Sequence, residues 1–137
     1  MFVVREVTLA ETRPLRQSVL RPHQTLEELA AHESGEAYAV GAYDGDTLVS
    51  VGFITPEGGP GAWRIRGMAT APEARRQGAG AAILAALVEY AEDQQATRIW
   101  CNARVPARSL YERAGFVVTS DVFEPPDIGP HVVMEQS

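Results

Sequence analysis

The fold is decided by the stretch RIRGMATAPEARRQGAG, which runs from Arg64 to Gly80. Its first residues complete a predicted strand, Ala62 to Thr70, and its last residues begin a helix predicted from Gly78 to about Gln94. The stretch therefore joins a strand to a long helix through a loop of arginines and small residues. The predicted apolar face of that helix consists of Ile83, Leu84, Leu87, Val88 and Ala91.

The loop itself has the features of an anion site. The first turn of a helix offers unpaired backbone N–H groups and the positive end of the helix dipole, and small residues let a phosphate approach closely. We therefore expect a diphosphate at this loop, although its glycines could instead serve only tight packing. The dinucleotide-binding fingerprint is not met, because Ile83 stands where its third glycine would be. The residues concerned are Arg75, Arg76, Gln77, Gly78, Ala79 and Gly80.

The flanking pattern predicts an α+β sandwich around one mixed sheet. Thr25 and Glu28 have the spacing of a capping box and predict a short helix, and the connection from Ala62–Thr70 to a strand at Arg98–Cys101 should be a parallel, right-handed crossover. In a helix that starts after Thr8, we expect Leu9, Leu15, Val19 and Leu20 to face the core. The other predicted elements are strands at Phe2–Val7, Ala37–Tyr43 and Leu48–Thr55, a short helix from Pro106, and closing strands at Phe116–Thr119 and His131–Met134.

Composition limits the functional classes. A chain of 137 residues with 45% hydrophobic and 22% charged residues is typical of one globular domain, here expected to span residues 1–137. Apolar runs are far shorter than the roughly 20 residues of a membrane helix, and an acid at Glu6 interrupts any secretory signal, so we expect a cytoplasmic protein without a membrane partner. The single cysteine, Cys101, excludes an intramolecular disulfide and a multi-thiolate zinc site, and no metal is expected.

Charge is unevenly distributed. The net charge of −6 disfavours nucleic-acid binding, which needs a basic face. The stretch Pro60–Gly80 differs, because it carries four arginines and one acid, Glu73, and so a net charge of +3. This stretch is therefore the candidate for a local anion site.

From about Arg64 to Met134, the chain resembles the GNAT superfamily of acyl-CoA-dependent N-acyltransferases. Arg75, Gly78 and Gly80 match the family's phosphate-loop pattern, and a second stretch, WCNARVPARSLYERAGF from Trp100 to Phe116, matches its later strand and helix. The closing segment Ile128–Met134 is similar to the tail of the ElaA-like branch. The resemblance implies an α/β/α sandwich whose mixed, mostly antiparallel sheet is splayed between strands 4 and 5. The matched positions of the second stretch are Ala107, Leu110, Tyr111, Gly115 and Phe116.

The resemblance also implies how acetyl-CoA would be held. Met68, Ala69 and Thr70 would offer main-chain groups to the pantetheine arm, and the backbone from Arg76 to Gly80 would bind the diphosphate. Gly67 is expected to mark a bulge that turns the Met68 N–H toward the thioester oxygen. The family often has an asparagine where this chain has Arg104, and Asn102 could replace it.

Two residues are candidates for proton transfer. By the resemblance, Tyr111 would return a proton to the thiolate of coenzyme A, and otherwise it is a half-buried helix tyrosine. A glutamate that acts as base in many members is replaced by Arg64, so His131 is the candidate base, with Glu124 as a second choice. The alternative for His131 is a partly buried strand histidine bonded to the preceding loop.

The chemical class of the amine that accepts the acyl group can be inferred only from charge. Arg64 and Arg66 are two residues apart on one strand and so share a face, whereas Trp63, Ile65 and Gly67 belong to the other. Two guanidinium groups would favour an amine that carries a carboxylate or phosphate, unless they pair with acids on neighbouring strands.

The expected activity is acetyl transfer from acetyl-CoA to a primary amine of a small molecule, by direct attack in a ternary complex. The alternative is a non-catalytic acyl-CoA sensor or accessory protein on the same fold. A homodimer is compatible with the sequence.

Overall fold

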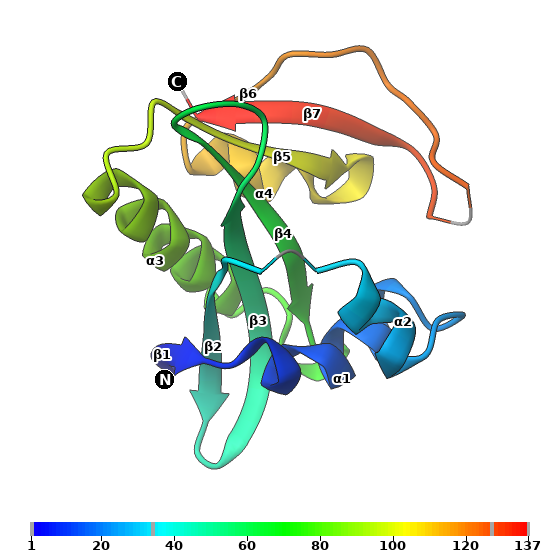
Figure 1. Ribbon diagram of the computed structural model, residues 1–137. Coiled ribbons are helices and arrows are strands. Elements are labelled where there is room, and N and C mark those ends of the chain that lie inside the picture. The colour runs from blue at the N-terminus through cyan, green and yellow to red at the C-terminus, as the bar shows by residue number, and fades with distance from the viewer. Residues whose placement is uncertain (1, 34, 127, 137) are drawn as a thin grey trace.

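The computed structural model describes residues 2–33, 35–126 and 128–136. Its strands are β1 (Val3–Val7), β2 (Tyr38–Asp44), β3 (Thr47–Pro56), β4 (Ala62–Thr70), β5 (Arg98–Arg104), β6 (Phe116–Val118) and β7 (His131–Gln136). Its helices are α1 (Leu9–Leu20), α2 (Leu26–Ala31), α3 (Ala79–Asp93) and α4 (Arg108–Arg113), with short 3₁₀ turns at Pro72–Ala74 and Val105–Ala107. The strands form one sheet in the order β1-β2-β3-β4-β5-β7-β6 (Figure 1).

The pairing confirms the expected mixed sheet. Every neighbouring pair is antiparallel except β4 and β5, which are parallel and are joined through α3. The parallel register ends at Ile65 and Cys101, although β4 continues to Thr70 and β5 to Arg104. The two strands then diverge, as Figure 1 shows, and the sheet is open at their carboxyl ends.

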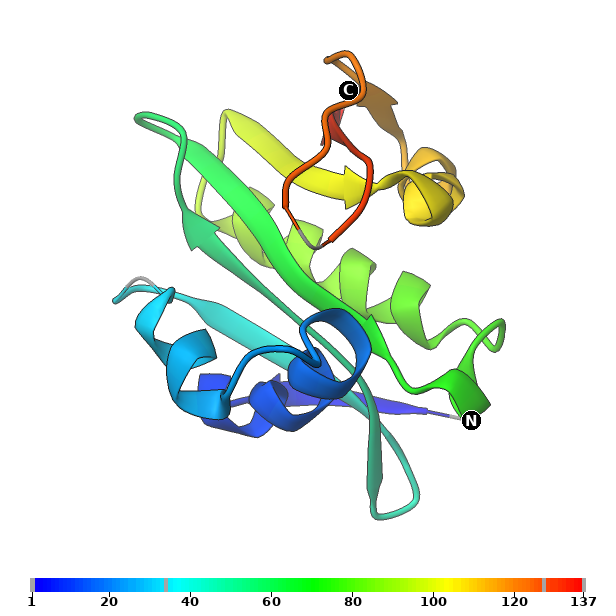
Figure 2. The same ribbon diagram turned by 90° about the vertical axis from the view of Figure 1, so that its right-hand side faces the viewer.

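Helices cover both faces of the sheet. α3 packs on one face of β2, β3 and β4, and α1 packs on the other face with α2 beside it (Figure 2). The predicted apolar face of α3 is confirmed, since all five of its residues are buried and Ile83, Leu84 and Leu87 are fully inaccessible. The expected capping box is present at Thr25, and the structure shows a second one at Thr8.

The inward face of α1 differs from the prediction. Its buried residues are Thr12 and Arg16, and the four expected apolar residues (Leu9, Leu15, Val19 and Leu20) are only half-buried. The Arg16 guanidinium lies 4.7 Å from the centre of the Phe53 ring and forms a 2.6 Å ion pair with Glu33. A buried arginine that is both stacked and ion-paired therefore takes the place of an aliphatic contact.

A bulge interrupts β4 at the point where the sheet opens. The register between β3 and β4 shifts between Val51 and Phe53, and Gly67 opposite this shift has φ +66°. The expected bulge at Gly67 is therefore confirmed. A Cβ at Gly67 would lie 2.7 Å from the Phe53 ring, over which the Arg66 guanidinium also lies. Gly67 thus faces the same side as Arg66, and its predicted place beside Trp63 and Ile65 was wrong, because the bulge inserts one residue into the alternation.

Replacing Gly67 by alanine should destabilise the fold by about 2–4 kcal/mol, through backbone strain and a clash with Phe53. The matched control is Gly45→Ala, because Gly45 has φ +62° but no atom within 4 Å of its Cβ position. Strain alone should cost that variant about 1 kcal/mol. Urea unfolding measures both, and equal losses would contradict the clash at Phe53.

Candidate active site

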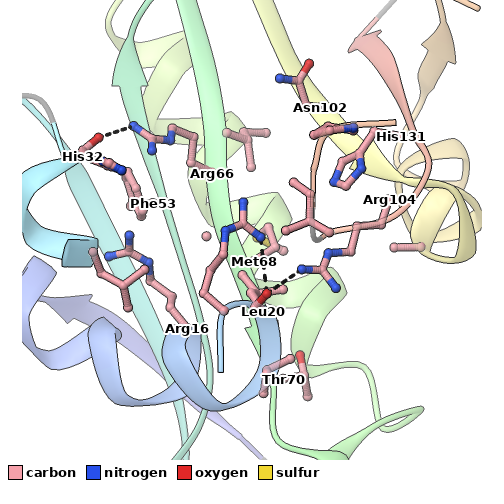
Figure 3. A pocket seen from close by; sticks show the side chains of 18 of the residues that line it. Arg16, Leu20, His32, Phe53, Arg66, Met68, Thr70, Asn102, Arg104 and His131 are labelled. Atoms are coloured by element: carbon pink, nitrogen blue, oxygen red, sulfur yellow. Dashed lines mark hydrogen bonds between the residues drawn. The ribbon is translucent and has the colours of Figure 1, made fainter. Parts of the chain in front are cut away.

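A cavity of about 890 Å³ lies where β4 and β5 separate. α1 and α2 form one wall, and β5, α4 and the segment before β7 form the opposite wall (Figures 2 and 3). Most of the residues predicted from the sequence meet here: Arg64, Arg66, Met68, Thr70, Arg75, Gly80, Asn102, Ala107, Tyr111 and His131 all line the cavity.

A second cavity of about 180 Å³ lies at the start of α3. The two cavities share Thr70, Arg75, Gly80 and Leu110, so they adjoin. Among the predicted loop residues, Arg76, Gly78 and Ala79 line the second cavity, as does Arg113 of α4. Ala69 and Gln77 line neither cavity: Ala69 is buried in the sheet, and the Gln77 side chain donates to the Glu73 carbonyl at 3.3 Å.

The backbone of this loop suits an anion such as a diphosphate. Gly78, the N-cap of α3, has φ +89°, and Arg76 has φ +65°. Gly78 has no side chain to cap the helix, so the first N–H groups of α3 receive no side-chain acceptor there. Left-handed residues in such a turn aim successive N–H groups into one concavity, where an anion accepts them.

The open edge of β4 suits an extended chain of amides. Beyond Ile65, residues 66–70 have no ladder partner on β5, and the bulge at Gly67 and Met68 disturbs the ladder with β3. Backbone groups on that edge are therefore available to a ligand that adds to the sheet as a strand would.

Tyr111 is held in a buried position by α4. Only 6% of it is exposed, and its ring meets that of Phe116 edge to face at 5.7 Å. Burial, with a smaller contribution from Cys101, raises the pKa of Tyr111, so the phenol stays protonated at neutral pH. The same surroundings raise the pKa of the Cys101 thiol to about 12.

His131 begins β7 and is 5% exposed. Its Nδ1 lies 2.8 Å from the Gly129 carbonyl oxygen, which can only accept, so Nδ1 carries the hydrogen and the neutral ring has its lone pair on Nε2. Burial, together with the positive charges of Arg104 and Arg21, holds the pKa of His131 below its usual value, although the bond to Gly129 opposes this. The bond to the preceding loop, which belongs to the alternative stated for His131, is present, and it fixes a neutral tautomer in the cavity wall.

The two predicted acceptor arginines differ in their partners. Arg64 forms a 2.9 Å ion pair with Glu57, in the turn before β4, and lies 5.3 Å from the centre of the Trp100 ring. Arg66 donates to the His32 carbonyl at 3.2 Å and stacks on Phe53. Arg64 therefore pairs with an acid, but that acid lies in the turn before β4, and among the described residues neither arginine forms an ion pair with an acid on a neighbouring strand.

Several cavity residues were not predicted as site residues. Arg16 enters from α1, Arg21 from the C-cap of α1, His23 and His32 from the segments around α2, and Arg104 from the end of β5. His23 and His32 are exposed and also line the cavity. Glu124, the second candidate base, is exposed and is not among the lining residues.

Comparison with known proteins agrees with this geometry. Residues 5–116 match the acetyltransferase (GNAT) family, and an N-acetyltransferase from Bacillus subtilis, the uncharacterized YitI, is 32% identical over 98% of this chain and 95% of its own. The chain belongs to the GNAT family. The activity that goes with membership is acyl-CoA-dependent N-acetylation.

Solved GNAT structures have the same fold as this GNAT chain. An aminoglycoside 6'-N-acetyltransferase complexed with coenzyme A aligns with a TM-score of 0.80 and 15% identity over 98% of this chain and 96% of the other. Escherichia coli ElaA aligns with a TM-score of 0.78 and 14% identity over the full length of both chains. These likenesses confirm the expected sandwich and its splayed sheet.

Two further findings concern the described part of this GNAT chain. Within residues 2–33, 35–126 and 128–136, no three histidine, cysteine or acidic side chains are grouped so that they could hold a metal ion. None of the helices in these ranges is long and apolar enough to cross a bilayer.

Replacing Gly80 by glutamate should weaken acetyl-CoA binding by about 10- to 100-fold, because a carboxylate would repel the diphosphate at the start of α3. Gly80→Ala is the matched control, since its Cβ would lie no closer than 3.7 Å to any neighbour. Calorimetric titration with acetyl-CoA measures the affinity, and thermal unfolding checks both folds. Equal affinities for the two variants would contradict the placement of the diphosphate.

Proposed function

We propose that this protein transfers the acetyl group of acetyl-CoA to a primary amine of a small molecule, by direct attack in a ternary complex. The observation that carries the proposal is that the two cavities adjoin, one at the anion-binding loop and the other beside Tyr111 and His131. A single ligand can therefore reach from the loop to the candidate proton-transfer residues. Acetyl-CoA, when bound, supplies the acetyl thioester.

We assign the binding of acetyl-CoA mainly to backbone groups and less to side chains. The turn from Arg76 to Gly80 would hold the diphosphate, with Arg75 beside it, and the open edge of β4 from Met68 to Thr70 would bind the pantetheine arm. Asn102 and Ala107 would border the arm from the other side. The Met68 N–H, at the bulge, would donate to the thioester oxygen as negative charge develops on it.

His131 is proposed as the general base. Its lone pair on Nε2 and its lowered pKa are what a base needs at neutral pH, because the imidazole is then mostly unprotonated. It would accept the proton that the amine loses as nitrogen bonds to the acetyl carbon, directly or through one water molecule.

Tyr111 is proposed as the acid that protonates the departing sulfur. A raised phenol pKa alone would make this transfer unfavourable. The same burial keeps the phenol protonated, so a proton is available where Tyr111 lines the cavity into which the thiolate would depart.

The proposal is tested by release of coenzyme A thiol in the presence of a panel of primary amines. Turnover that depends on the amine supports an acetyltransferase. If acetyl-CoA binds but no amine stimulates thiol release, the proposal fails and the alternative of an acyl-CoA sensor is preferred.

Tyr111→Phe should lower kcat by about 10²- to 10⁴-fold while the affinity for acetyl-CoA is unchanged, because only the proton donor is removed. The ring contact with Phe116 is retained, so the variant should remain folded. Steady-state kinetics and calorimetric titration measure the two effects. A loss of less than about threefold would make Tyr111 a packing residue.

His131→Gln should lower kcat/KM by about 10²-fold or more. In the unmodified protein, kcat/KM should fall as the pH drops below 6.5, because the pKa of His131 is lowered from that value and the base is lost on protonation. The ionisation of the acceptor amine changes kcat/KM at higher pH, and it does so equally for the unmodified protein and for His131→Gln. If the additional fall below pH 6.5 is the same in the variant, His131 is excluded as the base.

A further inference from the structure

The larger cavity is strongly cationic although the chain as a whole carries a net charge of −6. Six of its lining residues are arginines, and Glu28 is the only acid among the described residues that line it. These arginines come from α1, β4, β5 and the loop before α3, so the charge is not a local feature of the sequence. They are Arg16, Arg21, Arg64, Arg66, Arg75 and Arg104.

Only some of these arginines have a carboxylate partner. Arg16 is paired with Glu33 at 2.6 Å and Arg64 with Glu57 at 2.9 Å. Within the described part of the chain, Arg21, Arg66 and Arg104 form no ion pair, and their hydrogen bonds go to backbone carbonyl oxygens. Their positive charges therefore face the cavity without a carboxylate of the described residues in ion-pair contact.

Arg21 and Arg104 converge on a single oxygen from opposite walls. Nη1 of Arg21 lies 3.3 Å and Nη2 of Arg104 lies 2.8 Å from the carbonyl oxygen of Leu20, which ends α1. Figure 3 shows Arg104 reaching toward Leu20. A guanidinium has five N–H donors, and each of these two uses one at this carbonyl. The remaining donors are available to a ligand between the walls.

This arrangement is unfavourable without a ligand. Burial lowers the pKa of Arg21 and Arg104, and the charges of Arg104, Arg16 and Arg64 lower that of Arg21 further. A neutral carbonyl offers only a partial charge to two cations. A carboxylate or phosphate would offset the repulsion and could accept from both guanidinium groups at once.

The pair lies next to the proposed base. Arg104 of β5 is the ladder partner of His131 of β7, so their side chains are cross-strand neighbours, which normally have Cβ atoms about 5 Å apart. If the oxyanion of a ligand binds Arg104, an amine that is only a few bonds from the oxyanion would lie close to the imidazole of His131. The diphosphate loop, in contrast, lies at the other cavity, beside Arg76 and Arg113.

We propose that Arg21 and Arg104 form a subsite for an oxyanion of the acceptor, and that the acceptor is a compact amine with a carboxylate or phosphate a few bonds from its nitrogen. Arg66 lies on the neighbouring wall and adds to the positive field. The inference rests on the proposed function, and it places the acid-binding role mainly on arginines other than Arg64, whose charge Glu57 already offsets.

Matched acceptors test the class of substrate. Glycine is compared with glycinamide, β-alanine with β-alaninamide, and O-phosphoethanolamine with ethanolamine, so that each pair differs in its oxyanion. The acid of a pair should have a KM about 10- to 100-fold lower than its neutral counterpart. The first two pairs report on carboxylate and the third on phosphate. Equal or better turnover of the neutral amines, or of spermidine, would overturn the proposal while leaving the proposed function intact.

Variants test the residues. Arg21→Gln and Arg104→Gln should each raise the KM for the preferred acid by about 10- to 100-fold and leave the KM for acetyl-CoA unchanged. Arg104→Lys keeps the positive charge but lacks the planar guanidinium group. Its KM for the preferred acid should lie between those of the unmodified protein and Arg104→Gln. Arg5→Gln, which removes an equal charge from the exposed edge strand β1, is the control. A rise in the KM for acetyl-CoA alone would assign the pair to coenzyme A and overturn the proposal.

Binding without turnover provides an independent measurement. Propionate and ethyl phosphate lack the amine of β-alanine and O-phosphoethanolamine and cannot be acetylated on nitrogen. Either anion, bound between Arg21 and Arg104, should raise the pKa of His131 measured by NMR, while His23 and His32 serve as internal references. Arg104→Gln should remove this response. If neither anion shifts the His131 resonance, or the shift persists in Arg21→Gln and Arg104→Gln, the subsite is refuted, whether or not the protein acetylates any amine.

Discussion

The structure depends on the point at which β4 stops pairing with β5. Up to Ile65 and Cys101 the two strands form an ordinary parallel ladder, and beyond it each strand continues alone. Unpaired backbone cannot be buried without cost, so the gap must be filled by water or by a ligand that supplies donors and acceptors. The bulge at Gly67 lies at the same level of the sheet and bends β4 away. Binding capacity is thus created by interrupting the sheet.

Charge is arranged around this gap in a way that the overall composition conceals. Acidic residues on the outside give the chain its net charge of −6, whereas the wall of the larger cavity is rich in arginine. Low-dielectric walls strengthen the field inside such a cleft and enrich anions there. The buried ion pair of Arg16 and Glu33 joins α1 to the segment after α2, so the charge of this arginine is offset within the protein.

The sequence predicts the elements whose signals are local. The capping box at Thr25, the apolar face of α3 and the glycine bulge each depend on residues within a few positions, and the structure agrees with them. The interior face of α1 was missed because Arg16 satisfies its charge with Glu33, 17 residues away.

The convergence of Arg21 and Arg104 could not be foreseen, since the contact between Arg104 and Leu20 spans 84 residues. Periodicity identifies which side of an element is apolar, but it does not identify which polar side chains meet across a cleft. The roles proposed for Tyr111 and His131 came from a family resemblance and from residue chemistry, and they remain proposals.

The segment between β6 and β7 has a consequence for how such proteins diverge. Phe123 and His131 exchange backbone hydrogen bonds of 2.9 and 2.7 Å, which pin this segment to the start of β7. Phe123, Pro125, Pro126 and Ile128 of the segment face the cavity, yet its ends are fixed in strands that belong to the sheet. Substitutions, insertions or deletions in it can therefore reshape the cavity wall without moving β4 or the start of α3. Acceptor preference can evolve in this segment separately from the part that we assign to acetyl-CoA.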